Sequence, residues 1–220
     1  MEIKEQSGLR AVLADVELPR MAMIRQKFPR DGIEDVAAYL MEKLDREDLR
    51  SRIKPGMRVV LTGSSRKIAN MPLILRELAD YVRAQGAHPY IIPAMGSHGG
   101  ATAEGQREIL ESYGITEEAC RCPIFSSMET VQVGSLSNGD EVRVDRFAYE
   151  ADAVIVVGRI KAHTAFRGAY ESGLVKMMAI GMGKREGADS LHRAGFQWMG
   201  ERLPQYAKVI FDHTNIIFGV

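Results

Sequence analysis

Short apolar runs alternate with amphipathic helical segments through the middle of the chain. The apolar runs cover residues 57–62, 89–93 and 153–157, and helical spacing of apolar residues falls between them at 72–85 and 102–113. A strand followed by a helix and then by another strand is the pattern of a parallel sheet with crossover helices. The unbroken apolar run A-V-I-V-V at 153–157 is expected of a central strand that is buried on both faces.

Further elements are expected on either side of this core. They are a strand over 9–18, a helix over 33–44, a hairpin of 131–136 and 141–147 around S-N-G-D, and helices over 172–182 and 188–199. Asn-Gly between two strand-like runs is a strong hairpin signal. The sequence therefore predicts an α/β fold, a three-layer Rossmann-like domain with a mainly parallel sheet and a small antiparallel insertion.

Composition limits the classes of partner. The 220 residues are 45% hydrophobic, which is enough to bury the core of one domain. Lys plus Arg and Asp plus Glu number 29 each, so no net charge attracts nucleic acid or an anionic membrane. No stretch approaches the roughly 20 apolar residues of a membrane-spanning helix. Cys120 and Cys122 are too close together for an ordinary disulfide and are interpreted as reduced thiols of a cytoplasmic protein.

The loop after 57–62 reads G-S-S-R-K. Its backbone amides, the hydroxyls of Ser64 and Ser65, and the guanidinium of Arg66 suit a phosphate or a carboxylate. An ordinary capped helix start with a surface arginine explains the same residues. Ligands of open α/β sheets bind outside the carboxyl ends of the strands, which is where this loop is expected.

The loop after 89–93 reads M-G-S-H-G-G-A-T-A-E-G and places His98 between glycines. Glycine permits positive φ and close approach of the backbone to a ligand. A histidine in that setting is a poor core residue, which favours acid–base chemistry or ligation. A loop histidine that caps a neighbouring strand is the alternative.

Downstream of 153–157, His163 again follows a strand, and Lys176 lies among Leu, Val and Met side chains. A lysine in such company either snorkels to solvent or is desolvated, and a desolvated amine becomes a nucleophile or an attachment point. His192 is either a metal ligand or a partly buried helix histidine. Zinc is not indicated, because neither H-x-x-x-H nor C-x-x-C occurs.

At these residues the sequence resembles the nickel-pincer-dependent lactate racemase family, over about 57–192. The resemblance implies that His98 and His163 are the catalytic acid–base pair. It also implies that Lys176 is joined covalently to the cofactor, the nickel-pincer nucleotide (nickel pyridinium-3,5-bisthiocarboxylic acid mononucleotide), and that His192 ligates nickel. The segment between His163 and Lys176 is a few residues longer than in the family.

The G-S-S-R loop resembles the family's loop for the cofactor phosphate, which implies cofactor binding by Ser64, Ser65 and Arg66. The characterised lactate enzymes carry an Asp and a further Arg where this chain has Gly63 and Ser64, which argues against lactate itself. The implied substrate is a small 2-hydroxy acid, and the implied class is an isomerase, a racemase or epimerase.

By resemblance, one histidine takes the hydroxyl proton while hydride moves from C2 to the cofactor, and its return to the other face of the planar keto acid inverts the centre. Family enzymes are longer and carry a second domain over the cofactor. Residues 1–220 are therefore interpreted as the cofactor-binding amino-terminal domain, with the carboxyl-terminal domain apparently absent. The final run N-I-I-F-G-V agrees, because it has the pattern of a strand and natural domains rarely end inside one.

Two other classes of function stay open at this point. A non-catalytic phosphate- or nucleotide-binding α/β module would hold an anion in both glycine loops and bind its ligand without metal. A structural half-domain would bind neither and would expose a large apolar face near Val220.

Overall fold

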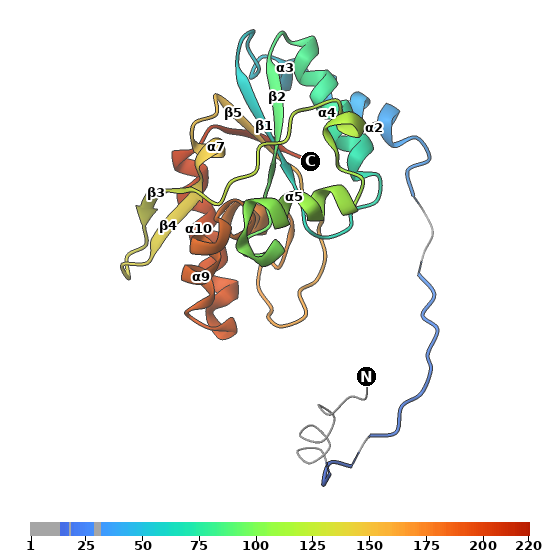
Figure 1. Ribbon diagram of the computed structural model, residues 1–220, viewed down its shortest axis with the longest axis vertical. Coiled ribbons are helices and arrows are strands. Elements are labelled where there is room, and N and C mark those ends of the chain that lie inside the picture. Colours follow the sequence, from blue (N-terminus) through green and yellow to red (C-terminus); the bar gives the residue numbers. More distant parts are fainter. Residues whose placement is uncertain (1–13, 18, 29–31) are drawn as a thin grey trace, which may run out of the picture. The chain divides into compact units, whose positions relative to one another are not determined.

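The computed structural model of the protein (Figure 1) describes residues 14–17, 19–28 and 32–220. Its contacts divide the chain into two compact units, 1–33 and 34–220. The described residues of the first unit form turns or irregular segments with exposed side chains. The strand expected over 9–18 lies mostly outside the described residues, and 14–17 do not form one. Within the described part of the chain, helices long and apolar enough to cross a membrane do not occur.

Parallel strands form the central sheet of the second unit, in the order β2-β1-β5-β6. The strands are β1 Arg58–Gly63, β2 His88–Pro93, β5 Ala153–Val156 and β6 Ile216–Gly219. Alternate side chains point to opposite faces, so Leu61 packs in one apolar cluster and its neighbour Val60 in the other, both with no exposed surface. The apolar run at 153–157 therefore lies inside the sheet, between β1 and β6, as predicted.

Helices cover both faces of this sheet and give three layers (Figure 1). One face carries α2 Val36–Leu44, α3 Glu47–Arg50, α4 Met71–Ala84, α5 Ala103–Ser112 and α6 Glu117–Cys120. The other face carries α7 Arg146–Tyr149, α8 Gly173–Lys176, α9 Lys184–His192, α10 Met199–His213 and the antiparallel hairpin β3 Thr130–Ser135 with β4 Glu141–Asp145. The predicted α/β fold class, with its small antiparallel insertion, is confirmed.

Helix α4 illustrates how the apolar spacing forms an element. Leu75, Leu78 and Val82 lie on one face of the helix and have no exposed surface. Each such side chain contributes about 1.5–3 kcal/mol by leaving water. The helix stops before Gly86, which adopts φ +77°, a conformation that favours glycine.

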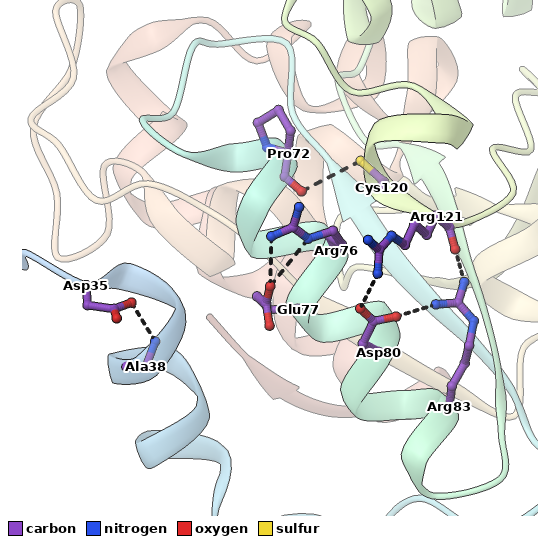
Figure 2. Close-up of polar contacts among 9 residues, drawn as sticks. All are labelled: Asp35, Ala38, Pro72, Arg76, Glu77, Asp80, Arg83, Cys120 and Arg121. Atoms are coloured by element: carbon purple, nitrogen blue, oxygen red, sulfur yellow. Dashed lines mark hydrogen bonds and ion pairs between the residues drawn. The ribbon is translucent and has the colours of Figure 1, made fainter.

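Polar contacts join α4 to the short helix α6 (Figure 2). The Asp80 carboxylate on α4 pairs with Arg121, the residue after α6, at 3.9 Å, and the Arg83 guanidinium donates to the Arg121 carbonyl. The Cys120 thiol donates to the carbonyl of Pro72 at 3.8 Å. Cys120 is a buried free thiol, as its spacing predicted. These contacts keep the segment that follows α5 against the apolar cluster that contains Leu61.

The region after β5 differs in part from the sequence prediction. The helix expected over 172–182 forms as α8 followed by the π-helix η2, Met177–Met182. The helix expected over 188–199 is wrong. Helix α9 ends at His192, Gly195 adopts φ +85°, and a short 3₁₀ turn, η3, leads into α10. Helix α10 itself was missed because it contains Pro204, a residue that ordinarily marks a helix boundary.

Candidate functional site

Loops from three neighbouring strands meet at the carboxyl edge of the sheet. The chain passes from β1 to β2 on one side and reaches β5 on the other side of β1, so the strand order reverses between β1 and β5. Such a switch point is where open α/β sheets bind ligands. The segment 64–66 follows β1, His98 follows β2, and His163 follows β5.

Side-chain contacts connect the first loop to both of the others. The Ser65 hydroxyl oxygen lies 2.5 Å from Nδ1 of His98, across the gap between the loops after β1 and β2. The Arg159 guanidinium donates to the carbonyl of Lys67 at 3.1 Å, between the loops after β5 and β1. The candidate site residues of these loops are therefore parts of one edge of the sheet.

Three glycines of the His98 loop adopt the positive φ that the sequence predicted. Gly96, Gly99 and Gly100 adopt φ values of +62°, +66° and +64°. Gly105 is needed for close packing, because a Cβ there would lie 2.1 Å from the carbonyl oxygen of Gly99. The loop is thus pressed against the first turn of α5, and His98 extends from it with an exposed side chain.

The electrostatic surroundings of His98 favour its neutral form. Partial burial of the ring lowers the pKa of His98 from its ordinary 6.5, and the positive charges of Arg66 and Lys176 lower it further. Lys176 is half-buried on α8, and its own pKa is lowered, chiefly by burial and then by the charges of Lys161 and Arg66. Desolvation, one of the two alternatives for Lys176, is thus supported.

His163 is half-buried in the loop after β5. Its backbone N–H donates to the Glu171 carboxylate at 2.8 Å, and its Nδ1 accepts the N–H of Ala165 at 3.1 Å. The neutral ring therefore carries its proton on Nε2. Burial lowers the pKa of His163, and the charge of Lys176 adds to the effect. Sequence reasoning missed Glu171, although a carboxylate between Gly168 and Gly173 of a histidine-containing loop is a signal that could have identified it.

His192 lies at the end of α9 with an exposed side chain. Its Nδ1 lies 2.6 Å from the carbonyl of Ala188. A carbonyl only accepts, so Nδ1 carries the proton and Nε2 keeps a lone pair, the arrangement usual for a histidine that binds metal. The ring of Phe196 lies 5.9 Å from the His192 ring and 6.3 Å from the His163 ring, so both histidines lie near one aromatic side chain.

The three loop residues that were predicted to bind cofactor differ in whether their polar groups already have partners within the protein. Ser64 is buried, and its hydroxyl donates to the carbonyl of Arg66 at 3.0 Å. Ser65 faces His98, and the exposed Arg66 side chain forms no hydrogen bond or ion pair with the described residues. The capped helix start of the alternative is absent, because α4 begins after Asn70, whose side chain makes no capping bond, but the exposed Arg66 agrees with its surface arginine.

Metal and cavity geometry set limits on the site. Among the described residues, three or more His, Cys, Asp or Glu side chains never gather closely enough to hold an ion. Two open cavities of about 480 and 540 Å³ lie beside α5 and between α2 and α4. Neither is lined by the four residues predicted for catalysis, tethering and nickel binding. Of these, His98 and His163 lie on loops at the carboxyl edge of the sheet, Lys176 lies on α8, and His192 lies at the end of α9.

The parallel sheet and the titratable loops around its switch point define an α/β domain with a candidate ligand site at the carboxyl edge of its sheet. A family model described as the lactate racemase N-terminal domain matches residues 12–202, so the chain belongs to this family. The resemblance seen in the sequence is confirmed. Among solved structures, the lactate racemase apoprotein from Thermoanaerobacterium thermosaccharolyticum is 13% identical over 82% of this chain, with a TM-score of 0.49. The chain spans 46% of the length of that structure. No curated protein matches the chain in sequence.

Proposed function

We propose that this chain is the cofactor-binding amino-terminal domain of a racemase or epimerase that acts on a 2-hydroxy acid, with His98 and His163 as its acid–base pair. The observation that carries the proposal is that the loops after β1, β2 and β5 meet at one edge of the sheet, where the charge of Lys176 adds to the burial that lowers the pKa of both His98 and His163. One amine within electrostatic reach of two loop histidines is expected where the three face a common ligand. Membership of the lactate racemase N-terminal domain family supports the same reaction class.

The side chains of this chain fit a tethered nickel-pincer nucleotide. The lowered pKa of Lys176 raises its fraction of free amine, the form that a covalent attachment requires. Lys184, the next lysine along the chain, is fully buried and donates to the carbonyl of Pro93, so it has no access to a ligand. Arg66 offers a cation for the phosphate.

His192 would hold the nickel through Nε2. A pincer is a chelating group that itself supplies most of the ligands of its metal, so a single histidine suffices on the protein side. When bound, the group supplies a hydride acceptor, a chemistry that amino-acid side chains lack. The protein contributes the binding, the orientation and the proton transfers.

Proton transfer from the substrate hydroxyl requires a neutral histidine. The lowered pKa values leave His98 and His163 mainly neutral at pH 7. Nδ1 of His98 faces the Ser65 hydroxyl, which can donate or accept, so Nε2 of His98 can serve as base or as donor. Nδ1 of His163 faces the N–H of Ala165, which only donates. A base role for His163 therefore requires its ring to release this N–H.

The tether can be tested by intact-mass measurement and metal analysis on protein made alongside the enzymes that build the cofactor. Peptide mapping is expected to locate the adduct on Lys176, and Lys176→Arg is expected to abolish it. Lys208→Arg is the matched control, because Lys208 is an exposed lysine that pairs with Asp212 on α10. An adduct on any other lysine, or a nucleotide bound without nickel, would reject the assignment.

The histidine roles can be separated by three alanine variants. His192→Ala is expected to lose nickel, whereas His98→Ala is expected to keep nickel and lose turnover. His213→Ala is the matched control, because its Nδ1 lies 2.9 Å from the carbonyl of Val209 at the end of α10, the same contact that His192 makes on α9. Racemisation retained by His98→Ala would reject the acid–base pair.

A further inference from the structure

A buried ion pair lies beneath the His98 loop, outside the residues of the proposed mechanism. Lys184 and Asp145 have no exposed surface, and Nζ of Lys184 lies 3.0 Å from Oδ2 of Asp145. This approach is an ion pair rather than a well-aligned hydrogen bond, because Oδ2 has no hydrogen-bond partner among the described residues. Lys184 also adopts φ +53° at the junction of η2 and α9, a conformation rare for a residue with a side chain. A buried charge and an uncommon backbone conformation at one residue indicate a specific role.

The Lys184 ammonium determines how the amide of Gln106 is oriented. Nζ donates to Oε1 of Gln106 at 3.1 Å and to the carbonyl of Pro93 at 2.6 Å. An ammonium has no acceptor, so the amide must turn its oxygen toward Lys184 and its nitrogen away. Gln106 is itself fully buried on α5, where an amide pointing the other way would leave both of its ends without partners.

The amide nitrogen of Gln106 then binds the backbone of the His98 loop. Nε2 donates to the carbonyl of Gly96 at 2.8 Å and to the carbonyl of His98 at 3.2 Å. Gln106 thus connects the buried ammonium to the backbone of the histidine itself.

A second contact ties the same loop to the helix that carries Lys176. The N–H of Gly96 donates to the carbonyl of Gly181 at 3.1 Å. Gly181 lies so close to Ala94 that a Cβ on it would come within 2.8 Å of the Ala94 carbonyl oxygen. Gly181 belongs to η2, which continues directly from Lys176. The segment from Lys176 to Lys184 is therefore bonded directly to the N–H of Gly96 through Gly181, and Lys184 reaches the carbonyl of Gly96 through Gln106.

The Asp145 carboxyl group contacts both the start of α7 and the Lys184 side chain. Its Oδ1 accepts the N–H of Ala148 at 3.2 Å and so caps α7, while Oδ2 faces Lys184. Burial lowers the pKa of Lys184 and raises the pKa of Asp145, and each group opposes the effect of burial on the other. The side chain that faces Lys184 is itself fixed at a helix start.

We propose that Lys184 is a positioning residue that acts through Gln106 to fix the His98 loop against the segment carrying Lys176. The inference rests on the proposed function only in giving His98 a role in turnover. The positioning itself is a statement about the protein without cofactor and can be tested there.

Gln106→Glu is the most direct variant. A glutamate keeps an acceptor for Lys184 but, when ionised, has no donor for the carbonyls of Gly96 and His98. His98 and His163 can be followed by NMR in the protein without cofactor, with each ring signal assigned from its alanine variant. Release of the loop is expected to move the pKa of His98 up toward its ordinary value, whereas His163, which this network does not touch, stays unchanged.

A double variant separates positioning from folding. Lys184→Met alone leaves Asp145 as a buried, unpaired carboxylate and is expected to be destabilised. Lys184→Met with Asp145→Asn removes both charges and keeps the cap on Ala148, so thermal stability is expected to recover. The His98 signal is nevertheless expected to stay displaced, because Oε1 of Gln106 still lacks its donor. Lys208→Met is the control for the substitution at an exposed site.

Turnover of the cofactor-loaded protein gives a second readout. A misplaced acid–base group is expected to lower kcat by roughly 10- to 100-fold, with KM changed by less than about twofold. An unchanged His98 titration in both Gln106→Glu and the double variant would overturn the positioning role. A displaced His98 signal with unchanged turnover would uphold the positioning role and would instead reject the acid–base role of His98.

Discussion

The Ser65 hydroxyl lies 2.5 Å from Nδ1 of His98, so a side chain on the loop after β1 orients a ring on the loop after β2. A neutral hydrogen bond of this kind contributes about 1 kcal/mol. Ser65→Ala is therefore expected to lower kcat of the loaded enzyme about fivefold by freeing the ring. Thermal unfolding should hardly change, because Ser65 is only half-buried. Ser112→Ala, which removes an exposed hydroxyl from α5, should leave kcat unaltered. Equal losses in the two variants would contradict this role.

The lowered pKa of His98 predicts the acidic limb of the activity profile. A base must be neutral, so activity should persist as pH falls to 6.5 and decline only below it. Arg66→Met removes a positive charge and is expected to raise the pKa of His98, which moves the limb to higher pH. The control is Arg185→Met, because Arg185 is an exposed residue that pairs with Asp189. A limb that stays in place after Arg66→Met would be inconsistent with the electrostatic link.

The same shift has a consequence for stability. Because the unfolded chain binds the proton at the ordinary pKa of 6.5 and the folded chain binds it only at lower pH, His98 makes the unfolding free energy fall as pH decreases through that window. The contribution of the neutral His98 to the unfolding free energy is fully present above pH 6.5. Urea unfolding at a series of pH values, compared between the natural protein and His98→Ala, measures it. A smaller slope in His98→Ala is expected.

Two glycines test how tightly the His98 loop is packed. Gly105→Ala places a Cβ 2.1 Å from the carbonyl oxygen of Gly99, a backbone atom that moves only if the loop moves. It is expected to lower the unfolding free energy by about 1–3 kcal/mol. Gly187→Ala on α9 meets only ordinary contacts, at 3.4 Å with the carbonyl oxygen of Arg143 and 3.8 Å with that of Ala179, and should be neutral or stabilising by up to about 1 kcal/mol. Urea unfolding distinguishes the two, and equal midpoints would refute the close packing.

The two cysteines should be unreactive in the folded protein. Burial raises the pKa of Cys120 to about 11 and that of Cys122 to about 12. Thiol reagents attack the thiolate, so labelling at pH 8 should be slow for both thiols and become rapid and complete when the chain is unfolded. A fast phase in the folded protein would show that one thiol is exposed or activated.

The strands and their loops could be predicted because the signal for each is local. Val59, Val60 and Leu61 are buried on both faces of the sheet, which selects an unbroken apolar run, and the glycine loop that follows β2 selects residues able to adopt positive φ. His98 was identifiable for the same reason. The parallel order of the strands then brings its loop next to the loops after β1 and β5.

The network of Lys184 could not be predicted, because its partners lie far away in the sequence. Gln106 is 78 residues from Lys184, and G-M-G-K reads like an exposed turn with a surface lysine. Only the packing of α9 against the hairpin and the His98 loop makes this ammonium a buried group. The helix boundaries after His192 failed for another reason, since Gly195 ends one helix where the apolar spacing continues.

The wide turns of the π-helix η2 determine the direction in which the Lys176 side chain points around the helix axis. Gly181 is fixed against Ala94, and Lys176 is the residue of α8 that immediately precedes this π-helix. Loss of one residue between them would let the segment tighten to ordinary α-helical turns and swing the lysine by about 100° around the axis. An insertion or deletion here would therefore change the direction of the Lys176 amine without unfolding the domain. The length of Met177–Met182 thus determines the direction in which a group attached to Lys176 would point.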